Sequence, residues 1–143
     1  MGEWTSRSFT DTTTVGVRVP AQLEQLTMLR ALAETVALIA DFALDEVTDI
    51  RLALDEVATS LILDAAPGST IDCEFTYDTD KMFVHVASVA VTESVVGHAG
   101  LGWHIVRTLT DSIAAAQGSY DSVRGGYPTV IDFSWVRGAQ NGQ

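Results

Sequence analysis

A glycine-rich stretch at residues 97–102, with the sequence GHAGLG, is the best candidate in this chain for a ligand site. Glycine lacks a Cβ atom, so the backbone at its three glycines can turn sharply and approach a ligand closely. The apolar spacing of residues 105–109 then predicts a helix. The first turn of a helix offers unpaired N–H groups to a phosphate. The same glycines also suit an ordinary connection between a loop and a helix, so both interpretations stay open at this point.

Glu56 and Ser60 form a second candidate site, because a spacing of four residues places both side chains on one face of a helix. This face is offset from the apolar positions of the same segment. A carboxylate there can take a proton from a water molecule or from a hydroxyl group. Charged residues of amphipathic helices usually face water, so a plain surface acid is the competing interpretation.

Neither the histidines nor the cysteine indicates a metal centre. His85, His98 and His104 lack the spacing of metal ligands, and we interpret them as structural or surface residues. Cys73 is the only cysteine, which excludes an internal disulfide. We predict that it is a small buried residue on a strand.

Two long helices are predicted ahead of the glycine-rich stretch. Between residues 21 and 42, apolar side chains recur at steps of three and four, which is typical of an amphipathic helix. These positions are Leu23, Leu26, Leu29, Leu32, Val36 and Ile39. A second helix is expected to begin at Asp45, whose side chain can cap it, and to end at Pro67 and Gly68. Its buried stripe is predicted at Ile50, Leu54, Val57 and Leu61.

Five strands are predicted around these helices. Alternation and β-branched residues place them at residues 12–19, 71–77, 82–91, 112–117 and 129–135. The second and third of these strands are joined by a short polar turn and should pair antiparallel. The order of elements predicts an α+β fold, a two-layer sandwich with the helices on one face of a mixed, mostly antiparallel sheet.

The composition indicates a single folded domain. The chain has 143 residues, of which 47% are hydrophobic, and this is enough for one core. We expect the domain at residues 12–136, with flexible ends at residues 1–11 and 137–143. No window approaches the roughly 20 apolar residues of a membrane span, and no basic segment followed by an apolar core begins the chain. We therefore expect a cytoplasmic protein with no membrane partner.

The chain is strongly acidic. Nineteen acidic residues against eight basic ones give a formal net charge of −11. Direct binding of nucleic acid is not expected, because it depends largely on Lys and Arg side chains that displace counterions from phosphates. A basic protein partner fits better, since electrostatic steering would draw it in. Acidity also serves solubility alone, and composition does not separate these two interpretations.

Residues 15–135 resemble the anti-sigma factors of bacterial stress and sporulation switches, which are serine protein kinases with the GHKL ATPase fold. Two segments carry the resemblance. Residues 49–60, DIRLALDEVATS, look like the family's first nucleotide motif, E-A-x-T-N, and residues 100–111, GLGWHIVRTLTD, look like its glycine-rich motif. The resemblance implies a GHKL fold that holds ATP and Mg²⁺ between the two helices, under a lid at residues 92–99.

The resemblance also implies roles for particular residues. Glu56 falls at the position of the general base, which takes the proton from the attacking hydroxyl. The backbone amides of Gly100, Leu101 and Gly102 fall where the phosphates are held. Thr129 falls near the threonine that lies below the adenine.

Three positions depart from the family pattern. Ser60 replaces the asparagine that helps to hold Mg²⁺, and a hydroxyl is a shorter and weaker ligand for this cation. Ser88 and Ala90 stand where the family has the aspartate and glycine of a D-x-G motif, whose aspartate bonds the adenine amino group. Losing that charge-assisted bond costs about 1.5–3 kcal/mol, or a roughly ten- to hundredfold loss of affinity. We therefore predict a degraded ATP site.

Three hypotheses of function follow. The leading one is a homodimeric anti-sigma factor that sequesters a sigma factor and is released by an anti-anti-sigma protein. Arg30 matches the family's contact arginine for these partners; alternatively, it is simply an exposed helix residue. The second hypothesis is an active kinase that uses ATP and Mg²⁺ to phosphorylate a serine of the anti-anti-sigma protein. The third is an unrelated α+β domain with a coincidental glycine turn.

Overall fold

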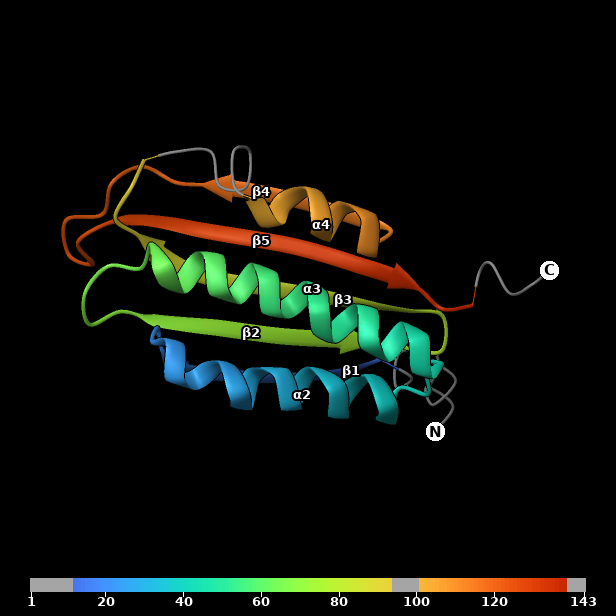
Figure 1. Ribbon diagram of the computed structural model, residues 1–143. Helices are drawn as coiled ribbons and strands as arrows, with labels where there is room; N and C mark the ends of the chain where they lie inside the picture. Colours follow the sequence, from blue (N-terminus) through green and yellow to red (C-terminus); the bar gives the residue numbers. More distant parts are fainter. Residues whose placement is uncertain (1–11, 94–100, 139–143) are drawn as a thin grey trace, which may run out of the picture.

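Figure 1 shows the computed structural model of the chain, which describes residues 12–93 and 101–138, without the side chains of residues 101 and 102. Several predictions lie outside the described residues. These are the flexible end at residues 1–11, residues 139–143 of the flexible end predicted at 137–143, the greater part of the lid, His98 and Gly100.

One five-stranded sheet forms the first layer, in the strand order β1-β2-β3-β5-β4. The strands are β1 (Thr13–Pro20), β2 (Thr70–Tyr77), β3 (Lys81–Ala90), β4 (Ser112–Gln117) and β5 (Tyr127–Val136). Each pair of neighbouring strands in this sheet is antiparallel, including the predicted β2–β3 hairpin. The predicted sheet is thus confirmed, and all the strand pairs described are of the antiparallel kind.

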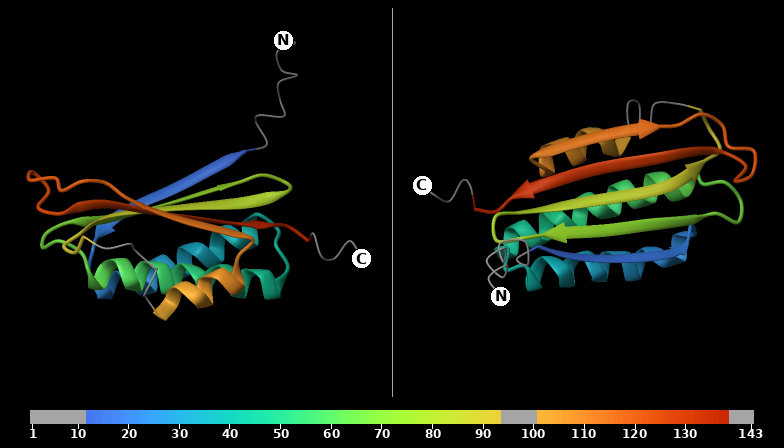
Figure 2. Two further views of the ribbon diagram at one scale, coloured as in Figure 1. Left: turned by 90° about the horizontal axis from the view of Figure 1, so that it is seen from above. Right: turned by 180° about the vertical axis from the view of Figure 1, so that it is seen from behind.

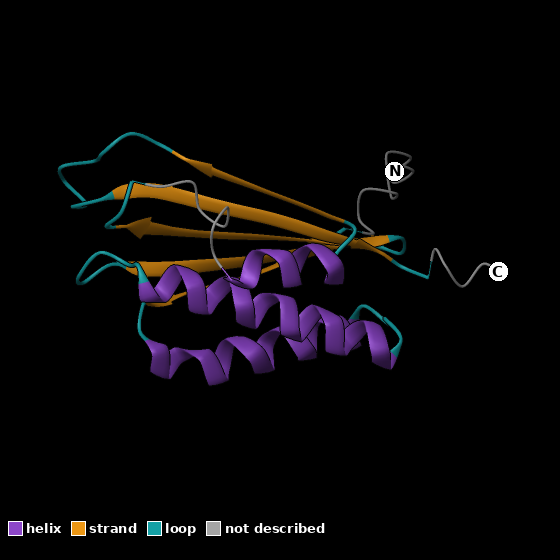
Figure 3. Ribbon diagram, turned by 45° about the horizontal axis from the view of Figure 1, so that its top comes forward, coloured by secondary structure: helices purple, strands orange, loops and turns teal. Residues whose placement is uncertain are grey.

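The helices form the second layer and cover one face of the sheet, as Figures 2 and 3 show. A short 3-10 helix, η2 (Leu23–Gln25), precedes α2 (Leu26–Ile39), and α3 (Leu44–Leu63) and α4 (Leu101–Leu109) follow. The middle helix, α3, packs against both α2 and α4. The predicted α+β sandwich is confirmed. The helix α3 lies between α2 and α4 and contacts both of them.

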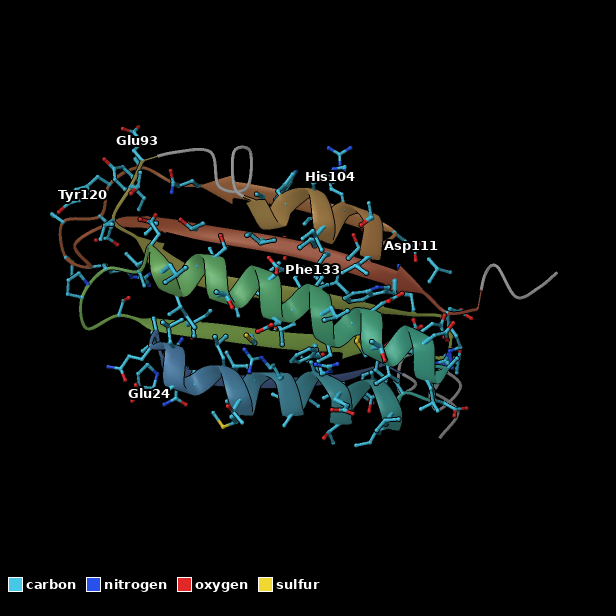
Figure 4. The ribbon with its side chains drawn as sticks, in the orientation of Figure 1. Glu24, Glu93, His104, Asp111, Tyr120 and Phe133 are labelled. Carbon is cyan, nitrogen blue, oxygen red and sulfur yellow. The ribbon has the colours of Figure 1, made fainter. Side chains whose placement is uncertain are left out.

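The core lies between the two layers. The predicted stripe of α3 is confirmed, because Ile50, Leu54, Val57 and Leu61 are all at most 3% exposed. From the sheet, Phe133 of β5 is completely buried and lies under the helices in Figure 4. Burial of such apolar side chains contributes about 25 cal/mol per Å² to folding, which makes this interface the main source of stability.

The apolar pattern of α2 is only partly confirmed. Leu26, Leu29 and Val36 are buried, but Leu23 is 51% exposed and Ile39 is 67% exposed. Leu23 belongs to η2, whose tighter turn takes it off the α-helical stripe. Ile39 occupies the solvent side of the last turn. Three alanines, Ala33, Ala37 and Ala40, fill buried positions that the sequence pattern did not single out.

The beginning of α3 differs from the prediction. The residue at the N-cap is Ala43, and Asp45 lies inside the first turn. The Glu46 side chain accepts a hydrogen bond from the backbone N–H of Ala43 at 2.9 Å. Oδ1 of Asp45 accepts one from the backbone N–H of Glu46, also at 2.9 Å, which a side chain at the N-cap would otherwise do. The negative charges of Asp45 and Glu46 stabilise this first turn, because the N-terminal end of a helix carries a partial positive charge.

Candidate functional site

Glu56 and Ser60 lie on α3, one helical turn apart, as the sequence predicts. The side chain of Glu56 is half-buried and that of Ser60 is exposed. Within the described residues, the Glu56 carboxylate makes neither a hydrogen bond nor an ion pair. It is therefore available to accept a proton from a ligand.

Ser88 and Thr129 lie directly opposite each other on β3 and β5, at one end of the sheet. Both are buried, at 6% and 1% exposure. The Thr129 hydroxyl donates to the carbonyl oxygen of Tyr127 at 2.9 Å and accepts from Nε2 of Gln117 at 3.1 Å. The Ser88 hydroxyl is buried without a hydrogen-bond partner. Such a group costs free energy unless a ligand or water satisfies it.

Ala90 ends β3, two residues beyond Ser88, and is 2% exposed. Its carbonyl oxygen lies so close to Gly126 that a Cβ atom on Gly126 would come within 2.4 Å of it. The two strands therefore approach each other tightly at this end of the sheet. Ala90, Ser88 and Thr129, which the sequence predicted to share one site, are brought together by the β3–β5 pairing.

Two polar residues that were not predicted from the sequence hold this end of the sheet. Nε2 of Gln117, on β4, donates to the carbonyl oxygen of Thr92 at 3.1 Å as well as to Thr129. Asp64, the residue after α3, accepts a hydrogen bond from the Thr92 hydroxyl at 2.8 Å. Neither residue belongs to a recognisable motif. The strand order reveals the position of Gln117, opposite Thr129, and the end of α3 beside β3 reveals that of Asp64.

The glycine-rich stretch leads into α4, which begins at Leu101 and includes Gly102 in its first turn. The predicted helix is present, and it runs alongside α3 in the opposite direction (Figure 1). The N-terminal end of α4 lies on the same side of the sheet as α3, which carries Glu56. This arrangement suits a phosphate, but Gly100 lies outside the described residues.

The histidines in the described residues occupy structural or surface positions. His85 lies on β3, where Nδ1 is 2.6 Å from a carboxylate oxygen of Asp132. His104 is exposed and projects from α4 away from the rest of the molecule (Figure 4). No cluster of His, Cys, Asp and Glu side chains suited to a metal ion occurs among the described residues.

Arg30 does not stand alone on the surface of α2. Its Nε donates to Oδ1 of Asp55 on α3 at 2.7 Å, and the two side chains are 40% and 29% exposed. An ion pair thus ties the guanidinium of Arg30 to the neighbouring helix. No pattern in the sequence links these two residues.

Comparison with known proteins identifies the relatives of this chain. No family model matches the sequence. Two curated proteins, both named anti-sigma-F factor RsbW and from the CDC 1551 and H37Rv strains of Mycobacterium tuberculosis, are 34% identical to it over 99 residues. The resemblance to RsbW-like anti-sigma factors is confirmed. The match covers 69% of this chain and 59% of each relative, so the chain spans less than two thirds of their length.

A solved structure supports the same fold for this RsbW-like chain. The crystal structure of the RsbU and RsbW domains of a Mycobacterium tuberculosis protein aligns with a TM-score of 0.63. The alignment covers 86% of this chain and 32% of that one, at 13% sequence identity. A likeness at this identity concerns the fold alone, and it agrees with a GHKL-like α+β domain. Within the described residues, none of the helices has the length and apolar character needed to cross a membrane.

Proposed function

We propose that this protein is a cytoplasmic anti-sigma factor, which sequesters a sigma factor and releases it when an anti-anti-sigma protein competes. The observation that carries this proposal is the 34% identity to two anti-sigma-F factors over 99 residues. The GHKL-like fold supports it. A homodimer is part of the proposal, as the family resemblance implies.

The charge of the helical layer supports a basic partner. Glu24 and Glu34 are exposed on the η2–α2 segment, and Glu24 projects outward in Figure 4. At the beginning of α3, the pKa of Asp49 is raised, first by burial and then by repulsion from Asp45 and Glu46. A concentration of negative charge of this kind attracts a positively charged surface such as the DNA-contacting face of a sigma factor.

The proposed sigma-factor complex can be tested with purified proteins. The sigma factors of the source genome would each be mixed with this protein at micromolar concentration and passed over a gel-filtration column with light-scattering detection. Co-elution with one of them is expected, and the mass of the free protein tests the homodimer. An absence of any complex with all of these sigma factors would contradict the proposed function.

We further propose that the nucleotide site is degraded. Ser60 offers an exposed hydroxyl where Mg²⁺ would need a stronger oxygen ligand. Ser88 offers a buried hydroxyl in place of a carboxylate at the adenine end. Titration calorimetry with ATP and Mg²⁺ tests this point, and a dissociation constant in the millimolar range or no binding is expected. Nanomolar to low-micromolar affinity would contradict it.

A kinase is the second candidate function, because the half-buried Glu56 carboxylate makes no hydrogen bond or ion pair within the described residues. A general base needs such an unoccupied acceptor. The test uses labelled ATP, Mg²⁺ and the anti-anti-sigma protein. Transfer of label that is lost in Glu56→Gln would support the kinase, and no transfer would leave a binding protein alone.

A further inference from the structure

The turn between α2 and α3, residues 40–43, contains a strained residue. Asp41 has a φ of 68°, in the left-handed region that aspartate adopts less readily than glycine. The N–H of Phe42 bonds the carbonyl oxygen of Ala37 at 3.1 Å, and the N–H of Asp41 bonds that of Leu38 at 3.0 Å. This is the pattern of a Schellman motif, in which glycine usually occupies the place of Asp41. The turn therefore depends on contacts that hold Asp41 in this conformation.

Arg137, the residue after β5, binds the last carbonyl groups of this turn. Its Nη2 donates to the carbonyl oxygen of Ala40, and its Nη1 donates to that of Asp41 at 3.5 Å. A guanidinium is favourable there because the C-terminal end of a helix carries a partial negative charge. The carbon at the centre of the guanidinium lies 4.8 Å from the centre of the Phe42 ring, a cation–π contact. One side chain thus holds both the backbone and the ring of the turn.

The same arginine and its neighbour tie the turn to the sheet and to α3. Nη2 of Arg137 also donates to the carbonyl oxygen of Asp78 at 3.4 Å, and the backbone N–H of Arg137 donates to that of Asp80 at 2.7 Å. The N–H of Gly138 donates to Oε2 of Glu46, in the first turn of α3, at 3.0 Å. Figures 1 and 2 show the end of β5, the α2–α3 turn and the β2–β3 turn at one end of the molecule. We call Arg137 and Gly138 the C-terminal clasp.

The C-terminal clasp lies apart from the candidate nucleotide site. Ser88 and Thr129 pair where β3 ends and β5 begins, whereas the clasp follows the last residue of β5. Both residues of the clasp belong to the segment predicted to be a flexible end, yet both form hydrogen bonds with distant parts of the domain. Nε of Arg137 is buried without a hydrogen-bond partner, so the guanidinium is enclosed by protein. Opening the clasp would let this nitrogen reach water.

We propose that the C-terminal clasp is a latch for the α2–α3 turn, a conformational device built into the fold. When the latch is closed, it holds Asp41 in the left-handed conformation. When it opens, Asp41 relaxes, and residues 40–43 and 137–138 lose their hydrogen bonds together while the rest of the domain stays folded. Regions that open in this way are joined to the core by few contacts and have a lower opening free energy than the core. The inference is independent of the proposed function.

Native-state hydrogen exchange of the full chain, measured by NMR, tests the latch. The amides of Asp41, Phe42 and Gly138 are expected to share one opening free energy, lower than that of the buried strand residues Val84 and Phe133. Their exchange should vary little with urea at concentrations that leave the fold intact, because a local opening exposes little surface. Exchange of these amides only through global unfolding, with the free energy of Val84 and Phe133, would overturn the inference.

The variant Arg137→Met tests the guanidinium, because methionine keeps an unbranched side chain and removes the donors. We expect the amides of Asp41, Phe42 and Gly138 to exchange about 10- to 100-fold faster, as the loss of hydrogen bonds from a charged group predicts. Arg107→Met is the matched control. Arg107 is exposed on α4 and makes no hydrogen bond or ion pair within the described residues, so its loss should leave these amides unchanged. Unchanged exchange in Arg137→Met, or an equal acceleration in Arg107→Met, would overturn the inference.

Two further variants complete the test. Asp41→Gly removes the strain and is expected to slow the exchange of Phe42 and Gly138 again when it is combined with Arg137→Met. A double variant that exchanges as fast as Arg137→Met would show that Asp41 does not drive the opening, and the latch would be wrong. If Arg137→Met does not fold, Arg137→Lys gives the same comparison, because lysine keeps the charge and loses the fork that reaches two carbonyl groups.

Discussion

Ser88 and Thr129 are neighbouring buried hydroxyls with opposite hydrogen-bond states. Thr129 has two hydrogen-bond partners, Tyr127 and Gln117, whereas the Ser88 hydroxyl has none. An unsatisfied buried hydroxyl destabilises the folded state, and removing it can be neutral or stabilising. A satisfied hydroxyl contributes to stability. The two residues therefore allow a matched comparison at one end of the sheet.

We predict that Ser88→Ala leaves the free energy of unfolding unchanged or raises it by up to about 1 kcal/mol. Thr129→Val keeps the shape of the side chain but removes its hydroxyl, which leaves the Gln117 amide and the Tyr127 carbonyl without this partner. It should lower the free energy of unfolding by about 1–3 kcal/mol. Urea unfolding of the ligand-free protein measures both. A larger loss in Ser88→Ala than in Thr129→Val would show that Ser88 has a partner in solution.

Cys73 is buried on β2 at 1% exposure, as the sequence predicts. Burial raises the pKa of its thiol to about 12, from an ordinary value of 9.0, and the charge of nearby Asp72 adds to this shift. The thiol is therefore protonated and unreactive at pH 8. Because the folded-state pKa is raised, its contribution to stability is complete below about pH 9 and is lost between about pH 9 and 12.

We predict that a thiol reagent at pH 8 modifies Cys73 only in unfolded molecules. In urea, the rate of modification should therefore rise in proportion to the unfolded fraction measured by circular dichroism. Rapid, complete modification of the native protein without denaturant would contradict the burial of this side chain.

At the scale of elements, the close approach of β3 and β5 depends on Gly126. A Cβ atom there would come within 2.4 Å of the Ala90 carbonyl oxygen and 2.8 Å of Cγ1 of Val89. A contact with backbone at this distance cannot be relieved by a side-chain rotation, so the strands must move apart. The same movement would separate Ser88 from Thr129.

We predict that Gly126→Ala lowers the free energy of unfolding by about 2–4 kcal/mol, as overpacking against backbone does. Gly118→Ala is the matched control, because its Cβ would meet only the Pro128 ring, at 3.9 Å. This control should change stability by less than about 1 kcal/mol. Chemical denaturation of the two variants gives the comparison. Equal stability would show that the end of the sheet adapts without cost.

The elements were largely predictable from local sequence, and the contacts between them were not. The repeat at Ile50, Leu54, Val57 and Leu61 revealed the buried face of α3, because helical periodicity is a local property. The predicted N-cap was wrong because α3 begins at Leu44, one residue before Asp45, and the side chains of Asp45 and Glu46 accept hydrogen bonds from first-turn and N-cap N–H groups from inside the helix.

The candidate site was predictable only in part, for the same physical reason. The motif resemblance located Glu56, Ser88 and Thr129. The roles of Gln117 and Asp55 depend on which strand pairs with β5 and on how α2 packs against α3. Such long-range contacts leave no periodic signal in a single sequence.

At the scale of the whole molecule, the net charge of −11 and its placement would govern the approach of the proposed sigma factor. Exposed acids such as Glu24 and Glu34 lie on the segment before α3. Long-range attraction of this kind raises the association rate more than it slows dissociation, and salt screens it over about 10 Å at 0.1 M.

We therefore predict that the proposed sigma-factor complex weakens about tenfold when NaCl is raised from about 50 to about 300 mM, mainly through a slower association rate. Surface plasmon resonance at several salt concentrations measures both rates. In the variant Glu24→Gln/Glu34→Gln, the dependence on salt should become shallower, because two of the attracting charges are gone. An affinity that does not vary with salt would mean that the acidity serves solubility and that apolar contacts alone hold the partner.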